Sequence, residues 1–180
     1  MAERNALVRG ADQALRRALA GRLADEGATL VDGAVERLDA LVHVVGSPAA
    51  APFVGTDAGR WFGSVMAELT PAFDTIRAAA PALRRSASGR LVLVGAGWFP
   101  ADRPDATAAA AVHGALVALT KTLARDLGPD GVTVNQVVVD PGRPVDREAV
   151  VAAVSYLCGP AAGATTGQLL TVGRGGPVRP

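Results

Sequence analysis

The amino-acid sequence predicts an α/β fold in which one parallel sheet of about six strands is covered by helices on both faces. Short apolar runs alternate along the chain with longer segments whose apolar residues recur at helical spacing. The run Leu41-Val42-His43-Val44-Val45 is almost uninterrupted in its apolar character, which is typical of a parallel strand buried on both faces. Glycine and Pro–Gly pairs separate the runs. This alternation indicates successive β-α-β units.

Each element can be justified from its local pattern. Leucines at positions 15, 19 and 23 place one apolar face on the first helix, and Gly27 ends it. Two long helices are expected at 60–84 and 106–127, the second ended by Gly128-Pro129. A shorter helix is expected at 147–157. The strands are expected at 6–8, 28–31, 41–45, 90–94, 132–139 and 168–172.

Length and composition restrict the function classes. The 180 residues, 49% of them hydrophobic, predict one domain over 1–180 with an exposed tail at 173–180. The net charge of +1 and the absence of a basic run give no case for nucleic-acid binding. No run reaches the roughly 18 apolar residues of a membrane span. Cys158 is the only cysteine, so a buried structural thiol, a reducing compartment and a cytoplasmic location are expected. Two histidines and one cysteine, far apart, predict no metal site.

Several segments occur in a characteristic order. Gly10 follows the first apolar run, and residues 38–46 end in Val-Val-Gly. Gly89-Arg90-Leu91-Val92 precedes the second long helix, and Val134-Asn135 and Pro141-Gly142 follow it. From about residue 6 to residue 176 the chain resembles a short-chain dehydrogenase/reductase (SDR), most closely the 3-oxoacyl-carrier-protein-reductase type. The resemblance implies a Rossmann-like doubly wound sheet in a reduced form.

The catalytic positions of that family are changed. Where the family keeps Asn, Ser, Tyr and Lys, this chain has Glu68, Ala96, Ala109 and His113. The spacings within the last three match the family, so these are substitutions. An alanine side chain neither donates nor accepts a proton, which removes general acid catalysis by the family's route. The resemblance therefore implies a chain without the family's redox chemistry.

The dinucleotide site also departs from the family. Its Gly-x-x-x-Gly-x-Gly turn keeps only the first glycine, and a long arginine stands at the last. The short stretch between Val31 and Leu41 replaces a helix, a strand and a helix, and four residues, 143–146, replace the substrate lid. No cofactor is expected, and NAD(P) binding is expected to be weakened, although Arg9 and Arg16 remain candidates for phosphate contact. The degenerate cofactor positions are Gly10, Ala14, Arg16, Gly46, Pro141 and Gly142.

What the chain retains suggests assembly. In tetrameric family members the equivalents of 60–84 and 106–127 pack across a two-fold axis, and both segments keep their full length here. The first hypothesis is a non-catalytic, SDR-like subunit that pairs with an active SDR homologue, with self-association as the simpler assembly. The aromatic residues that could anchor such an interface, or else belong to the core, are Trp61, Phe62, Phe73 and Trp98.

Other functions stay open. Glu68 and His113 could form an acid–base pair for a cofactor-independent dehydratase, cyclase or isomerase, or a structural hydrogen bond. His43 and Asp140 are weaker candidates beside the same cleft; His43 is expected to be a hydrogen-bonded, partly buried histidine. A ligand-sensing module with Trp98 stacked on a flat ligand and a residual NAD(P)H-dependent ketoreductase complete the set.

Overall fold

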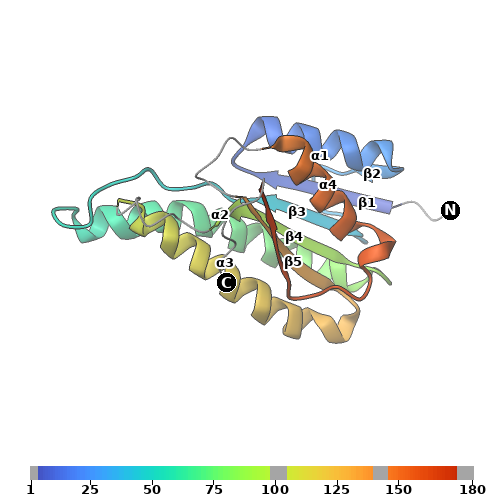
Figure 1. Ribbon diagram of the computed structural model, residues 1–180. Coiled ribbons are helices and arrows are strands. Elements are labelled where there is room, and N and C mark those ends of the chain that lie inside the picture. Colours follow the sequence, from blue (N-terminus) through green and yellow to red (C-terminus); the bar gives the residue numbers. More distant parts are fainter. Residues whose placement is uncertain (1–3, 98–104, 140–145, 174–180) are drawn as a thin grey trace.

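A computed structural model describes residues 4–97, 105–139 and 146–173 (Figure 1). Six parallel strands form one sheet in the order β2-β1-β3-β4-β5-β6. This confirms the predicted α/β fold, with the strand count expected from the sequence. The strands are β1 (Arg4–Gly10), β2 (Ala28–Leu30), β3 (Ala40–Val44), β4 (Arg90–Ala96), β5 (Thr133–Val139) and β6 (Leu169–Val172). The helices are α1 (Gln13–Asp25), α2 (Ala58–Arg84), α3 (Thr107–Leu127) and α4 (Arg147–Cys158).

The helices form two layers around the sheet. α1 and α4 lie on one face and α2 and α3 on the other, as Figure 1 shows. Each layer has its own apolar core. The core under α2 and α3 includes Leu41, Leu91 and Leu116, whereas the core under α1 and α4 includes Val42 and Leu157. Alternate residues of the central strands therefore serve both cores, which explains their continuous apolar runs.

Several element boundaries differ from the sequence prediction, and two of the differences have a visible cause. β4 continues to Ala96, where a loop was expected from Gly95, because β5 runs beside it and pairs Ala96 with Val139. α2 begins at Ala58, two residues early, because the Asp57 carboxylate accepts a hydrogen bond from the Arg60 amide at 3.0 Å and caps the helix.

The short connection between β2 and β3 leaves β2 at the edge of the sheet. Asp39, only 8% exposed, ties this connection to its neighbours. Its carboxylate accepts hydrogen bonds from the Asn5 amide at 2.8 Å and from the Ser86 hydroxyl at 2.6 Å. The Leu38 amide also donates to the Ala82 carbonyl of α2 at 3.1 Å. These bonds close the gap that a further helix, strand and helix fill in the resembling family.

Candidate functional site

Glu68 lies at the carboxyl edge of the sheet. α2 holds this half-buried side chain against the backbone just beyond β3. A Cβ atom placed on Gly46 would lie 2.2 Å from the Glu68 Oε2 atom. Glycine at position 46 therefore makes room for the carboxylate at this edge.

His113 occupies the corresponding place beside the next strand. A Cβ on Gly97 would lie 3.0 Å from the His113 Cε1 atom and 1.9 Å from a Val138 methyl group. The His113 Nδ1 atom is buried and has no hydrogen-bond partner. Burial lowers the pKa of His113, so the imidazole is neutral at pH 7 and its free ring nitrogen can act as a base.

Glu68 and His113 therefore come from different helices and reach the carboxyl ends of two adjacent strands, β3 and β4. Within the described residues no hydrogen bond joins the two side chains. The structural hydrogen bond considered from the sequence is thus not formed. The two side chains therefore lie at the same edge of the sheet without a bond between them.

Ala96 and Ala109 stand where the family keeps Ser and Tyr. Ala96 ends β4, and Ala109 lies in the first turn of α3, only 6% exposed and packed inside. Neither side chain offers a polar atom. The position of the family's proton donor is filled by an apolar contact.

His43 lies on the same side of the sheet and differs from its prediction. It is only 2% exposed, one residue before the end of β3, between Arg9 of β1 and Leu93 of β4. Its Nδ1 atom is buried without a hydrogen-bond partner, so the expectation of a satisfied histidine is wrong. Burial lowers its pKa to about 4. The sequence missed this because an apolar strand shows burial but not whether a polar atom finds a partner.

Gly10, the first glycine of the family's dinucleotide-binding turn, keeps the backbone conformation of that turn. Gly10 has a φ of 119°, and a Cβ there would lie 1.8 Å from the Val44 carbonyl oxygen. The helix N-terminus beyond it has changed. The Asp12 carboxylate accepts a hydrogen bond from the Leu15 amide at 2.9 Å and caps α1. A negative charge therefore occupies the amide-rich end at which a phosphate would otherwise bind. Asp before a helical leucine pattern was the sequence signal for this cap.

The two arginines near that turn have different surroundings. Arg9 forms an ion pair with Asp32 at 2.8 Å, while Arg16 is half-buried and its Nε atom has no hydrogen-bond partner. Asp32 lies just beyond β2, roughly twenty residues after the glycine turn, where dinucleotide-binding folds place an acidic residue on the ribose. Ala14 is exposed on the first turn of α1. Gly10 and Asp32 thus match positions of a dinucleotide-binding turn, while Asp12 caps the helix that follows it.

Some predicted residues lie outside the described part of the chain, namely Trp98, Asp140, Pro141 and Gly142. Within residues 4–97, 105–139 and 146–173, no group of three or more His, Cys, Asp or Glu side chains is placed to hold a metal ion. Cys158 is 2% exposed, and burial raises the pKa of its thiol to about 12. It is the buried structural cysteine that the sequence predicts.

A ridge of large apolar side chains follows the outer surface of α2. Phe62, Met66 and Phe73 are 61%, 52% and 55% exposed and lie along one side of the helix. Trp61, in contrast, is partly buried against the core, and its indole donates to the Thr107 hydroxyl of α3 at 3.0 Å. Phe62 and Phe73 therefore do not belong to the core, and Met66 was not recognised from the sequence.

The exposed surface of α3 is formed by small residues. Ala110, Gly114 and Ala118, spaced four residues apart, are all exposed. The segment Thr107–Asp130 is long and apolar enough to cross a membrane by length and composition, and only 28% of its most apolar window is buried. Core helices of water-soluble proteins can be equally long and apolar, but most of their surface is buried. In α3 most of the apolar window is not buried, so much apolar surface is uncovered.

Comparison with known proteins agrees with the fold. A family model described as enoyl-(acyl carrier protein) reductase matches residues 24–142. The chain belongs to the short-chain dehydrogenase/reductase superfamily. This SDR-like chain is similar in structure to a short-chain dehydrogenase/reductase from Serratia marcescens, with 26% identity, a TM-score of 0.81 and coverage of 94% of this chain and 95% of that one.

Two more distant structures share the fold. One, described as YwfH, an NADPH-dependent reductase involved in bacilysin biosynthesis, has 18% identity and a TM-score of 0.82, covering 94% of this chain and 98% of that one. The other is an SDR-family oxidoreductase from Burkholderia thailandensis, with 21% identity and a TM-score of 0.80, covering 96% of this chain and 92% of that one.

Proposed function

We propose that this chain is a non-catalytic SDR-like subunit that assembles with an active SDR and stabilises it or completes its substrate cleft. The exposed apolar surface of α2 and α3 carries the proposal. Large apolar side chains that remain more than half exposed in an isolated chain are typical of a contact surface. The ridge of α2 beside the small residues of α3 suits ridges-into-grooves packing against two helices of a partner.

The changed cleft supports the non-catalytic part of the proposal. Ala109 replaces the family's proton donor with a buried methyl group. Loss of general acid catalysis costs roughly 10²–10⁴-fold in rate. Asp12 adds electrostatic repulsion where the pyrophosphate of a dinucleotide would lie. We therefore propose that the chain does not use NAD(P) by itself and that any redox chemistry belongs to its partner in the cytoplasm.

Native mass spectrometry of the complex isolated from its source tests this assembly. A mass that includes a second, different SDR chain is expected. A mass equal to one chain, or to its simple multiples, would argue against pairing with a relative. The double substitution Phe62→Ser with Phe73→Ser should release the partner, whereas Ala67→Ser, at an exposed α2 position outside the ridge, should not. Saturable NADPH binding by the isolated chain would contradict the cofactor part of the proposal.

A second candidate is cofactor-independent acid–base catalysis. The observation that favours it is the pair of glycines, Gly46 and Gly97, that bring Glu68 and His113 to the ends of adjacent strands with no partner between them. A neutral imidazole and a carboxylate in one cleft can exchange protons with a bound molecule. Dehydration of a 3-hydroxyacyl thioester, followed by the absorbance of the enoyl thioester, is a direct assay.

In that assay His113→Ala and Glu68→Gln should each lower turnover by ~10²-fold or more. Circular dichroism spectra of both variants should match the original protein, because neither side chain makes a hydrogen bond in the described structure. Unchanged turnover in the histidine variant would eliminate this candidate.

A further inference from the structure

A separate cavity of about 230 Å³ lies between α2, β1 and the short connection that follows β2. Its floor is apolar, and nearly all of it belongs to the core under α2. Ala78 and Val35 lie nearer to solvent at its rim. A Cβ placed on Gly33 would meet nothing within 4 Å, so the connection itself adds open space. The floor is formed by Leu7, Leu38, Ala79 and Ala82.

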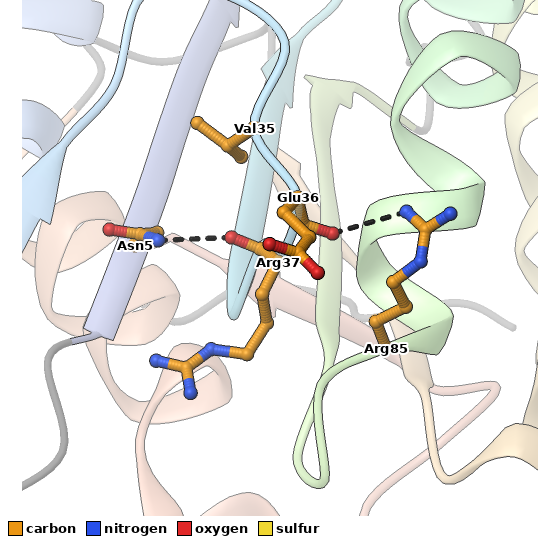
Figure 2. Close-up of a pocket in the computed structure, with 5 residues that line it drawn as sticks. All are labelled: Asn5, Val35, Glu36, Arg37 and Arg85. Atoms are coloured by element: carbon orange, nitrogen blue, oxygen red, sulfur yellow. Dashed lines mark hydrogen bonds between the residues drawn. The ribbon is translucent and has the colours of Figure 1, made fainter.

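The wall of this cavity is held in place by hydrogen bonds at its base. Figure 2 shows the connection from the neighbouring depression at the amino edge of the sheet, with Val35 lining both hollows. The Asn5 side chain donates to the Arg37 carbonyl oxygen at 3.0 Å. The Arg85 guanidinium donates to the Glu36 carbonyl oxygen at 3.1 Å. Anchored to both β1 and the end of α2, the wall is preformed, which reduces the entropy lost when a ligand binds.

One cation lies among these apolar groups. Arg9 lines the cavity together with the hydroxyl-bearing Thr75 of α2. The Arg9 side chain is 32% exposed and its ion pair with Asp32 involves a carboxylate that is 99% exposed. The guanidinium also donates to the backbone carbonyl oxygens of Asp32 and Val8. The solvated ion pair itself contributes little, so a second carboxylate that approaches from the less polar cavity can share the guanidinium. Thr75 already donates to the Pro71 carbonyl at 2.7 Å and offers only an acceptor.

We propose that this cavity binds a small molecule with an apolar body and one carboxylate, the body against Ala79 and Ala82 and the carboxylate at Arg9. The volume equals about eight waters of the bulk liquid, which limits the ligand to roughly ten heavy atoms. The methyl groups of the alanines leave the space that larger side chains would fill. This site is on the side of β1 and α2, away from Glu68 and His113, and it does not depend on the proposed assembly.

Octanoate is a suitable probe, with octanol and octylammonium as matched molecules that differ only in the head group. Binding to the full chain is measured by isothermal titration calorimetry and by saturation-transfer NMR. Octanoate should bind saturably, octanol at least ~10-fold more weakly, and octylammonium more weakly still. Equal binding of the three probes, or no saturable octanoate binding, would overturn the proposal.

Variants locate the site. Ala79→Leu fills the floor, and Ala78→Leu covers the rim from an exposed position at which folding is not at risk. Both should reduce octanoate affinity by ~10-fold or more, while Ala67→Leu, an exposed alanine of the same helix, should leave it unchanged. Arg9→Gln should remove the preference for octanoate over octanol. Unaltered octanoate affinity in the Ala78 variant, or a retained preference in the Arg9 variant, would refute the assignment.

Discussion

The lowered pKa of His43 allows a quantitative test of its burial. Its pKa of about 4 lies below the ordinary value of 6.5, so the unfolded chain binds a proton that the folded chain rejects. The unfolded state therefore gains protons first as the pH falls through 6.5. Stability that is fully present above pH 6.5 is lost progressively until about pH 4.

The size of this loss follows from the pKa difference. Each unit of difference between the folded and unfolded pKa corresponds to ~1.4 kcal/mol. The full loss of stability therefore approaches ~3 kcal/mol, of which ~2 kcal/mol is lost by pH 5. For a domain of this size such a loss is a large fraction of the whole free energy of unfolding.

Urea unfolding followed by circular dichroism at pH 7, 6 and 5 measures the effect against His43→Leu. That variant has no group to titrate and removes a nitrogen that lacks a hydrogen bond, so at pH 7 its stability should lie within about 1 kcal/mol of the original. His113→Leu controls for the other histidine. If the original chain and the His43→Leu variant lose the same free energy between pH 7 and pH 5, His43 is not buried as described.

The remaining predictions concern stability and reactivity. Gly10→Ala should unfold the chain or reduce its stability by several kcal/mol, measured by thermal melting, since the new methyl group would meet the Val44 carbonyl at a positive φ; a native-like melting temperature would contradict this. Cys158 should react with 5,5′-dithiobis(2-nitrobenzoate) only after urea unfolding, because its thiol is buried and its pKa is about 12; rapid reaction of the folded chain is the opposing result. Asp39→Ala should cost ~2–4 kcal/mol in urea unfolding, because it leaves the Ser86 hydroxyl and a backbone amide without their acceptor, and a loss below ~1 kcal/mol would show that the connection is held in another way.

Much of the fold followed from local pattern. The leucines of α1 and the apolar runs of β3 and β4 placed these elements correctly, because burial on one helix face or on two strand faces leaves a periodic trace in the sequence. Boundaries were less certain where a partner decides them. β4 extends to Ala96 only because β5 lies beside it, and that pairing is not visible in either segment alone.

For the candidate site, too, some properties follow from the sequence and others only from the tertiary structure. The sequence by itself determined that Ala96 and Ala109 cannot move protons, since that is a property of the side chain and needs no neighbour. Only the tertiary structure decided that Glu68 and His113 lie against Gly46 and Gly97 without bonding to each other.

The orientation of helix surfaces was likewise a tertiary matter. Phe62, Met66 and Phe73 are as apolar as any core residue, and their sequence is compatible with burial. Their exposure depends on which side of α2 the sheet and α3 cover. The cavity beside Arg9 lies where the short connection between β2 and β3 leaves one side of α2 uncovered. Sequence pattern thus determined which elements form and which chemistry is lost, while long-range packing decided which surfaces and polar atoms remain without a partner.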